Sequence, residues 1–569
     1  MCGIAGILGK DSNNSKIICA MLDVQQHRGP DAKALWDDAF ITLGHNRLRI
    51  IDLSENANQP MVSICRRFTI VYNGEIYNYL EIKEQLKEHY NFKTNSDTEV
   101  VLAAYIQWGI AALQQLNGMF SFAIWDCQDH KLIAVRDRFG VKPFYYTIFQ
   151  NQLFFSSEIK TLFTAGVPKF KNQKVWANYY VYGTYGMPNE TFWENIHQLP
   201  ASHYFEVYFD ENLKYSNIKL QKWYDFANRI KKIVPSTVAE LKLKYTALLN
   251  DAIQLRFKAD VPLGMNVSGG LDSSTLINLV HENLSSQQSI EAFTFYSNNK
   301  EYDELPWVEE VIKTTSYPLN KVLFDYKEIP KLIDAVSWFQ DEPFGGFPTL
   351  AYSLLFAAAR KKGIKVILDG QGMDEAWAGY DYYFNNSNHV IQGLNSSPVR
   401  PEVLIESFRA LAIKEEYERP FDNDLQNLQY RDLFYTKIPR ALRFNDRISM
   451  MHSIELREPF LDYRLVELAF AQSETLKIQD GKSKWLLRDL VKKKLGDAIA
   501  LAPKRALQIP QREWIANELS SYFNEKIELF AKLENIDEDK VREIWKDYLN
   551  GNQDNSFYLW QWINSISVL

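Results

Sequence analysis

The stretch "NVSGGLDSSTLINLV" (residues 266–280) decides the fold of the second half of the chain. It predicts a strand, a turn at Gly269 and Gly270, and a helix that begins beside Asp272. Both glycines are expected to take positive φ and to let the backbone approach a ligand closely. The backbone N–H groups and the dipole at a helix start favour an anion. Further donors come from three serine hydroxyls, those of Ser268, Ser273 and Ser274.

The carboxylate of Asp272 is out of place in a bare anion site unless a cation accompanies it. A magnesium ion that bridges carboxylate and phosphate oxygens resolves this conflict. No Lys-Ser or Lys-Thr pair follows the glycines, so the pattern differs from the usual P-loop. A capped helix after a tight turn is the alternative reading without a ligand.

A second segment, "VILDGQGMDEAWAGY" (366–380), repeats the order of strand, glycine turn and carboxylates. From about residue 238 onward, longer helices alternate with short strands such as "FTFY" (293–296). Such alternation predicts a parallel sheet covered by helices. Because ligands bind at the carboxyl ends of such strands, Asp272 and Asp374 are expected to share one metal–phosphate group. A purely structural loop is the alternative for the second segment.

The first 160 residues follow a different pattern, with short apolar strands separated by turns. "FITLGHNRLRIID", "FTIVYNGEIYN" and "KLIAVRDRFGVKPFYY" mix β-branched and aromatic residues, with Gly, Asn or Asp at the breaks. One segment, "TEVVLAAYIQWG", has helical spacing and is predicted to end at Gly109. The pattern indicates an α+β domain, with two sheets packed face to face. Residues 165–235 are less regular and read as turns and hairpins.

The length of 569 residues exceeds what one core supports, so two domains are expected. We place them at 1–210 and 238–569, joined by a linker at 211–237. The formal charge of −7 argues against nucleic acid as a partner. No apolar run has membrane-spanning length, no secretory signal is visible, and the four cysteines lack metal-site or disulfide spacing. These features favour a cytoplasmic enzyme.

The chain opens "MCGIAGILGK", with a cysteine directly behind the first methionine. If Met1 is removed, Cys2 carries a thiol and a free α-amine on one residue. An α-amine with a reference pKa of about 7.7–8.0 can accept a thiol proton near neutral pH. The opening therefore fits a catalytic residue, although it is also compatible with an accident of sequence.

These segments together resemble a known family. The "SGGLDSS" loop is similar to that of the ATP pyrophosphatase superfamily, and "MCGIAGI", "HRGPD" (27–31), "VYNGEIYN" (71–78) and "SDTE" (96–99) are similar to glutamine-hydrolysing asparagine synthetases. Further matches are "RDRFGVKPFYY", "SSEIKTL", "RISMMHSIELREPFLDYRLVE" and "GKSKWLLRDL". The resemblance implies an N-terminal Ntn-hydrolase-like αββα sandwich and a C-terminal α/β ATP pyrophosphatase domain of the adenine nucleotide alpha hydrolase-like type.

For the first domain, the resemblance implies a glutaminase. Cys2 would be the attacking thiolate after Met1 removal, with the Asn73 side chain and the Gly74 N–H as oxyanion donors. The carboxylate and ammonium of glutamine would be bound by three residues, Arg47, Glu75 and Asp97. His27 and His45 are interpreted as structural residues, and Cys19, Cys65 and Cys127 as inert.

For the second domain, the resemblance implies activation of a carboxylate by adenylation with ATP and Mg²⁺. Asp272 and Asp374 would hold the metal, and Lys484 would stabilise the transition state. The ATP-binding residues would be Ser268, Gly269, Gly270, Asp272, Ser273, Ser274, Phe295, Asp369 and Gly370. Ammonia from the first site would reach the acyl-AMP through an internal tunnel.

The match is weakest around the expected acceptor site. Gln371 stands where these enzymes carry a glutamate, and Met373 where the residue is usually small. "DEPFGGFPTLAY" (341–352) and "PKRALQIPQREW" (503–514) also differ from the family pattern. Aspartate is the first candidate acceptor, and a sugar acid of surface polysaccharide biosynthesis is the alternative. A non-synthesising protein that senses glutamine or nucleotide is a third hypothesis. The oligomeric state is left open, with a homodimer as one candidate.

Overall fold

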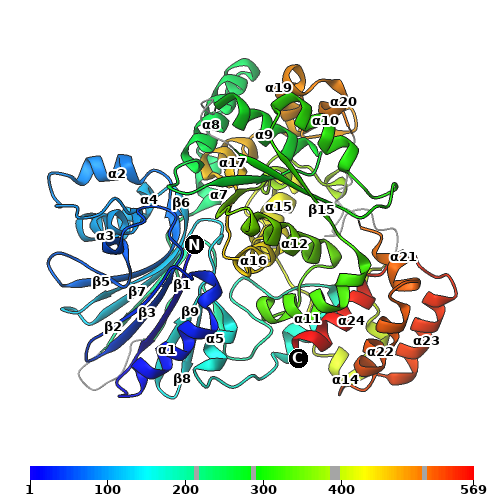
Figure 1. Cartoon of the computed structure of the whole chain (residues 1–569), viewed down its shortest axis with the longest axis horizontal. Helices are drawn as coiled ribbons and strands as arrows, with labels where there is room; N and C mark the ends of the chain where they lie inside the picture. The colour runs from blue at the N-terminus through cyan, green and yellow to red at the C-terminus, as the bar shows by residue number, and fades with distance from the viewer. Residues whose placement is uncertain (210–216, 284–289, 385–396, 503–508) are drawn as a thin grey trace.

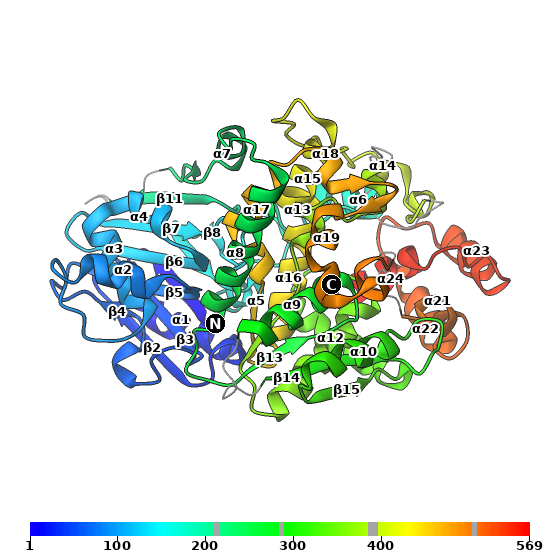
Figure 2. The ribbon, with the colours of Figure 1, turned by 90° about the horizontal axis from the view of Figure 1, so that it is seen from above.

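The computed structural model describes residues 1–209, 217–283, 290–384, 397–502 and 509–569. Two halves lie side by side, as Figures 1 and 2 show from two directions. The N-terminal half holds two six-stranded sheets, and the C-terminal half holds a five-stranded sheet. Among the described residues, no helix combines the length and the apolar character that a membrane crossing requires.

The first sheet of the N-terminal half is antiparallel and carries the start of the chain. Side chains along its central strand point alternately to the two faces of the sheet. Ile4 and Leu8 pack between the two sheets, while Ala5 and Ile7 pack against helix α1 (Asn14–Val24). The strands, in spatial order, are β10 (His197–Gln198), β8 (Tyr145–Phe149), β9 (Gln152–Ser156), β1 (Gly3–Leu8), β3 (Ile41–Arg47) and β2 (Ala32–Asp37).

The second sheet packs against the first and is covered on its other face by helices α2 (Tyr79–Leu86) and α3 (Asp97–Trp108). Its strands are β12 (Gln221–Lys222), β11 (His203–Tyr208), β7 (Lys131–Arg136), β6 (Gly118–Asp126), β5 (Phe68–Ile76) and β4 (Met61–Val62). Helix α3 ends at Gly109, as predicted, because that residue takes φ +57°. The four layers confirm the predicted αββα sandwich.

The C-terminal half contains the predicted parallel sheet. All neighbouring strands of this sheet run parallel, in the order β15 (Leu319–Leu323), β14 (Glu291–Tyr296), β13 (Leu263–Asn266), β16 (Val366–Leu368) and β17 (Glu455–Arg457). Val366 and Leu368 join one apolar cluster and Ile367 joins the other, so both faces of the sheet are buried. The fold class expected from the sequence is confirmed.

Helices cover both faces of the parallel sheet, as Figure 1 shows. The longer helices of this half, some of which pack on other helices and not on the sheet, are α8 (Val238–Arg256), α9 (Leu271–Asn283), α10 (Leu305–Thr315), α11 (Ile329–Gln340), α12 (Phe347–Lys361), α15 (Asp424–Arg431), α16 (Lys437–Met450), α17 (Tyr463–Phe470), α19 (Trp485–Leu495), α22 (Ser520–Ala531), α23 (Glu538–Leu549) and α24 (Phe557–Val568).

Residues 165–235 hold more regular structure than the predicted turns and hairpins. Helix α6 (Gln173–Tyr182) was not predicted, because its apolar residues are buried on several sides and leave no amphipathic period. Within 217–237, strand β12 extends the second sheet, and helix α7 (Phe226–Lys231) follows it. Trp223 and Tyr224, between these two elements, belong to the large core cluster.

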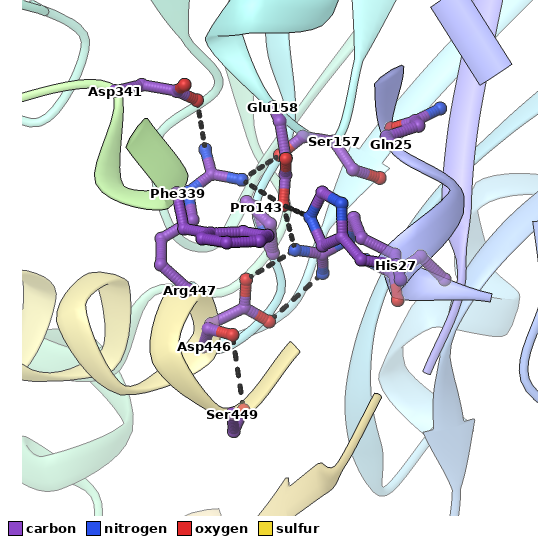
Figure 3. A network of polar contacts seen from close by, with 12 residues as sticks. Gln25, His27, Pro143, Ser157, Glu158, Phe339, Asp341, Asp446, Arg447 and Ser449 are labelled. Atoms are coloured by element: carbon purple, nitrogen blue, oxygen red, sulfur yellow. Dashed lines mark hydrogen bonds and ion pairs between the residues drawn. The ribbon is translucent and has the colours of Figure 1, made fainter. Parts of the chain in front are cut away.

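Charged side chains from the two halves meet at their boundary, where Figure 3 shows Arg447 between Asp341 and Glu158. Arg447 Nη1 lies 3.0 Å from Glu158 Oε1, and Arg447 Nη2 lies 3.6 Å from Asp341 Oδ2. Arg28 Nη1 donates to the same Glu158 oxygen at 2.9 Å, and Arg28 binds both oxygens of Asp446 at 2.9 and 3.1 Å. These five side chains are no more than 5% exposed.

The boundary network is balanced in charge. Lys160 Nζ lies 2.6 Å from Glu158 Oε2 and 3.0 Å from Asp341 Oδ1, so three cations face three carboxylates. His27 Nε2 lies 3.0 Å from Glu158; burial lowers the pKa of this imidazole, and the Glu158 carboxylate opposes that shift. Burial of ions costs free energy that only close opposite charges offset.

We predict that Arg447→Met lowers the free energy of unfolding by roughly 3–5 kcal/mol, because it leaves buried carboxylates without a cation. Urea unfolding followed by tryptophan fluorescence measures this change. The control is Lys33→Met, which removes a 2.6 Å pair with Asp23 whose side chains are 40% and 65% exposed. Its expected cost is within about 1 kcal/mol. Equal losses in the two variants would contradict the assigned role of the boundary network.

Candidate active sites

Cys2 lies just before β1, where the two sheets of the N-terminal half meet. Its backbone N–H donates to Asn73 Oδ1 at 3.0 Å, and its carbonyl accepts from Arg28 Nε at 3.1 Å. Burial raises the pKa of the Cys2 thiol, and the neighbouring N-terminal ammonium is the strongest opposing influence. A cysteine in this position becomes a better nucleophile when a base lies beside it.

The N-terminus lies at the boundary of the two halves in both views (Figures 1 and 2). The ammonium of Met1 donates to Glu455 Oε2 at 2.9 Å, and both groups are buried. Burial opposes ionisation of Glu455, but the N-terminal ammonium and Arg457 lower the pKa of this carboxyl to about 2. Glu455 belongs to β17, so the C-terminal half supplies part of the first site. Glu455 lies within the segment "RISMMHSIELREPFLDYRLVE", whose pattern alone predicts no role for it.

Asn73 and Gly74 lie on β5, opposite the start of the chain. Within the described residues, the buried Nδ2 of Asn73 has no hydrogen-bond acceptor, while its Oδ1 holds Cys2. A free amide donor beside a thiol is the arrangement that an oxyanion requires. A Cβ at Gly74 would lie 2.3 Å from the Met119 carbonyl oxygen, so no side chain fits there.

Glu75 and Asp97 form a buried acidic pair near this site. Asp97 accepts from Tyr72 Oη at 2.7 Å and from the Ile76 N–H at 2.9 Å. Glu75 Oε2 lies 3.5 Å from Arg457 Nη2, and within the described residues its Oε1 accepts no hydrogen bond. Burial raises the pKa of both carboxyls, and the charge of Asp97 raises that of Glu75 further. A cation placed between them would relieve this repulsion.

Arg47 is near Cys2, but its guanidinium is engaged by the following loop. Nη1 donates to the Ser54 carbonyl at 2.6 Å and to Asn58 Oδ1 at 2.9 Å. Nη2 donates to the carbonyls of Ile51 and Asp52. Because both Nη atoms of Arg47 already donate to this loop, the guanidinium has no free Nη donor for a substrate carboxylate in this structure.

His45 lies near the first site, but its imidazole is held by a backbone carbonyl. His45 Nε2 lies 3.1 Å from the Tyr72 carbonyl oxygen, and burial lowers the pKa of its imidazole to about 3. Cys19, Cys65 and Cys127 are free thiols outside the site around Cys2.

The second candidate site lies at the carboxyl ends of β13 and β16, which pair directly. The turn after β13 contains Gly269 at φ +67°, where a Cβ would lie 2.8 Å from Trp307 Cβ. The expectation of positive φ is therefore correct for Gly269 but wrong for Gly270, whose φ is not positive. Gly270 still has open space on its Cβ side, with only Ser268 Oγ within 4 Å, at 3.5 Å.

A cleft of about 1290 Å³, opening included, occupies this edge of the sheet. Predicted residues that line it are Ser268, Gly269, Gly270, Asp272, Ser273, Asp369, Gly370, Asp374 and Lys484. Ser274 is fully buried and is not among them, and Phe295 lines an adjoining cavity of about 340 Å³. Five polar lining residues were not predicted as site residues, Glu304, Tyr352, Tyr380, Ser483 and Arg488, although all but Glu304 lie in segments quoted above.

Lys484 joins the two predicted metal-binding carboxylates across the cleft. Its Nζ lies 2.7 and 2.5 Å from the Asp272 oxygens and 2.7 Å from Asp374 Oδ1. Burial opposes its charge, but the two carboxylates outweigh burial and raise the pKa of Lys484. Its φ of +55° is uncommon for a residue with a side chain, and such conformations cluster at functional sites. A Cβ at Gly379 would lie 1.9 Å from Asp374 Oδ1, so only glycine permits this contact.

The segments that differ from the family pattern are dispersed. Gln371 lines the cleft, whereas Met373 is buried and accepts from Tyr245 Oη at 3.5 Å. In 341–352, Asp341 and Glu342 contact the N-terminal half, and Tyr352 lines the cleft. Half of the 503–514 segment, residues 503–508, lies outside the described residues.

Comparisons with known proteins agree with this arrangement. The model for the glutamine amidotransferase domain matches residues 1–224, and the asparagine synthase model matches residues 244–568. Asparagine synthetase [glutamine-hydrolyzing] 1 of Bacillus subtilis is 28% identical, over 98% of this chain and 95% of the relative. Putative asparagine synthetase [glutamine-hydrolyzing] 2 of Methanocaldococcus jannaschii is 35% identical, over 68% and 76%. A Gibberella zeae protein named Amidase chry2 is 27% identical, over 90% and 88%. The chain therefore belongs to the glutamine-hydrolysing asparagine synthetase family.

Proposed function

We propose that this protein makes L-asparagine from L-aspartate, L-glutamine and ATP through a β-aspartyl-AMP intermediate, releasing glutamate, AMP and pyrophosphate. The observation that carries the proposal is the presence of two complementary sites in one chain. One places a thiol beside an amide donor at Cys2 and Asn73, and the other places carboxylates and a lysine at the ends of parallel strands.

In the first site, Cys2 would attack the side-chain amide of glutamine after Met1 is removed. Its α-amine would accept the thiol proton, which suits a reference pKa of about 7.7–8.0. The thioester formed with loss of ammonia would then be hydrolysed by water. Asn73 Nδ2, which has no acceptor among the described residues, would donate to the oxyanion together with the Gly74 N–H.

Glutamine recognition follows from the same contacts. Its ammonium would lie against Glu75 and Asp97, whose buried charges repel each other without a cation. Its carboxylate is assigned to Arg47, which then has to exchange a hydrogen bond to the 51–58 loop for one to the substrate. Substrate binding would thus be coupled to the position of that loop.

In the second site, the residues present fit a magnesium ion. Magnesium takes one or two carboxylates and completes its coordination with phosphate oxygens and water. Among the described residues, no three or more acidic, His or Cys side chains are grouped so that they could hold a metal ion. Asp272 and Asp374 would hold the ion, which supplies neutralisation of phosphate charge when bound. Lys484, which lies against both carboxylates in this structure, would turn to the phosphates and stabilise the charge that develops during adenylation.

The leading proposal and its alternative differ in the acid that is amidated. The alternative is the same chemistry on another carboxylate, such as a sugar acid. The observation behind the alternative is the neutral Gln371 in the cleft lining. We expect glutamine-dependent release of pyrophosphate with aspartate, and asparagine as the product by mass spectrometry. A panel of sugar acids and other amino acids is the comparison. Turnover confined to an acid other than aspartate would contradict the leading proposal.

Cys2→Ala is expected to lower glutamine hydrolysis at least about 10³-fold, because it removes the nucleophile. Amide formation with added ammonium salts should stay within about threefold of the unaltered protein, since the cleft is untouched. Glutamate release and amide formation are measured in parallel on the same preparation. Cys19→Ala is the matched control and should change neither rate. Full glutaminase activity in Cys2→Ala would refute the assignment.

Asn73→Ala is expected to reduce the kcat of glutamine hydrolysis by about 10²–10³-fold with a smaller change in KM, because the donor acts on the transition state. Steady-state glutamate release measures both constants. Asn46→Ala, at another buried asparagine whose Nδ2 is already bound to the Leu22 carbonyl, is the comparison. An equal fall in both variants would indicate structural damage and not loss of an oxyanion donor.

A further inference from the structure

Lys477 is a buried cation that neither site described above uses. It ends helix α18 (Glu474–Lys477), and its side chain is fully buried. Its Nζ donates to Gln429 Oε1 at 2.8 Å and to the Phe470 carbonyl at 2.7 Å, and no carboxylate of the described residues lies within 4.0 Å of it. Burial lowers the pKa of Lys477 to about 7. A buried ammonium with neutral partners alone is costly, so its place in the fold calls for an explanation.

Gln429, on helix α15, is the side chain that this ammonium holds. It is also fully buried, and its Nε2 donates to the carbonyls of Glu375 at 2.6 Å and Ala376 at 2.9 Å. An ammonium can only donate and a carbonyl can only accept, so one orientation of the amide satisfies both sides. Lys477 therefore fixes the end of the Gln429 amide that faces these two carbonyls.

The two carbonyls end helix α13 (Met373–Ala376), which carries Asp374. The carbonyls of the three residues before Glu375 accept from backbone N–H groups of the same segment. The carbonyls of Glu375 and Ala376 accept from Gln429 instead. Because so short a helix is unstable by itself, its position depends on contacts of this kind with its neighbours.

The other end of this link lies at the base of the hairpin that carries Lys484. Strands β18 (Ile478–Gln479) and β19 (Lys482–Ser483) are antiparallel, and the residue after Lys477 pairs with the residue before Lys484. The two lysines thus lie at the same end of the hairpin. The bond from Lys477 to Gln429 ties that end of the hairpin to helix α13.

The two tied segments also meet in the cleft, where Lys484 Nζ lies 2.7 Å from Asp374 Oδ1. In the proposed reaction Lys484 turns to the phosphates, so this contact would be given up when the nucleotide binds. The buried contact between Lys477 and Gln429 does not involve the cleft and would persist. It is therefore able to keep the two segments in place in both states.

We propose that Gln429 and Lys477 are positioning residues that hold Asp374 and Lys484 at the spacing that ATP with Mg²⁺ requires. The inference rests on the proposed function, in which Asp374 is a metal ligand and Lys484 a phosphate ligand. Neither Gln429 nor Lys477 is among the residues that line the cleft, so each acts through a neighbouring segment. Outer contacts that orient metal ligands commonly affect affinity almost as much as the ligands do.

Gln429→Glu separates positioning from stability. Its carboxylate can form an ion pair with the Lys477 ammonium, but it cannot donate to the two carbonyls of α13. We expect the affinity for ATP with Mg²⁺ to fall at least about tenfold, as is usual when an outer contact of a metal ligand is lost. Equilibrium dialysis of the full-length protein with labelled ATP measures the dissociation constant. An unchanged constant would overturn the proposal.

The same dialysis in EDTA assigns the loss to the metal ligand. ATP without Mg²⁺ does not use the Asp374 carboxylate, and Lys477 keeps its partner in Gln429→Glu. The affinity for free ATP should therefore stay within about threefold of that of the unaltered protein. An equal loss with and without Mg²⁺ would contradict the assignment to Asp374.

Exchange of the two side chains tests the link itself. Gln429→Lys alone sets two ammonium groups against each other and should weaken binding of ATP with Mg²⁺ at least about tenfold. In Gln429→Lys/Lys477→Gln the new ammonium can donate to both carbonyls of α13, and the new amide can accept from it and donate to the Phe470 carbonyl. The double variant should recover to within about threefold of the unaltered protein. A double variant no better than Gln429→Lys would contradict a direct link.

Gln561→Glu is the matched control. Gln561 is another fully buried glutamine whose Nε2 donates to a carbonyl, that of Tyr179, and it does not line the cleft. We expect a lower midpoint of urea unfolding in this variant, with the affinity for ATP with Mg²⁺ unchanged. A fall in affinity equal to that of Gln429→Glu would indicate general destabilisation and would overturn the positioning role.

Two measurements distinguish failure of this inference from failure of the proposed function. Glutamine hydrolysis in Gln429→Glu should stay within about twofold of the unaltered rate, because the first site is distant from α13. If the unaltered protein does not bind ATP with Mg²⁺, the proposed second site fails, and this inference fails with it. If the unaltered protein binds and Gln429→Glu binds equally well, the inference alone fails.

Discussion

Pairing of buried charge is the constraint on which both sites depend. Glu158 and Asp446 can be removed from water at the boundary of the halves because Arg28 and Arg447 lie within about hydrogen-bonding distance of them. Arg28 also holds the carbonyl of Cys2, so the same residue that joins the halves positions the first site. The contact between the halves and the position of Cys2 therefore depend on the same side chain.

The parallel sheet explains the second site in a similar way. Its strands all end at one edge, so turns more than ninety residues apart bring Asp272 and Asp374 to a common cleft. Lys484 then reaches both carboxylates from a backbone conformation that is costly for a residue with a side chain. The surrounding packing, including the close approach at Gly379, offsets that cost.

Local patterns predicted the sheets, helix α3 and the cleft residues of the glycine turns, because period and turn chemistry are properties of short segments. The resemblance to the family also predicted that Asn73 and Cys2 belong to one site, and the structure places them in contact. The sequence could not assign Glu455 and Arg457 to the first site, since their contacts with Met1 and Glu75 depend on how the halves dock. Helix α6 was missed because burial on several sides hides its period.

Strand β17 touches the first candidate site through the Arg457 side chain and the second through the Arg457 carbonyl. One residue of this three-residue strand thus contacts both candidate sites. Thermodynamic linkage then imposes reciprocity: whatever factor glutamine applies to nucleotide affinity through this strand, nucleotide applies equally to glutamine affinity. Strand β17 would carry that coupling free energy.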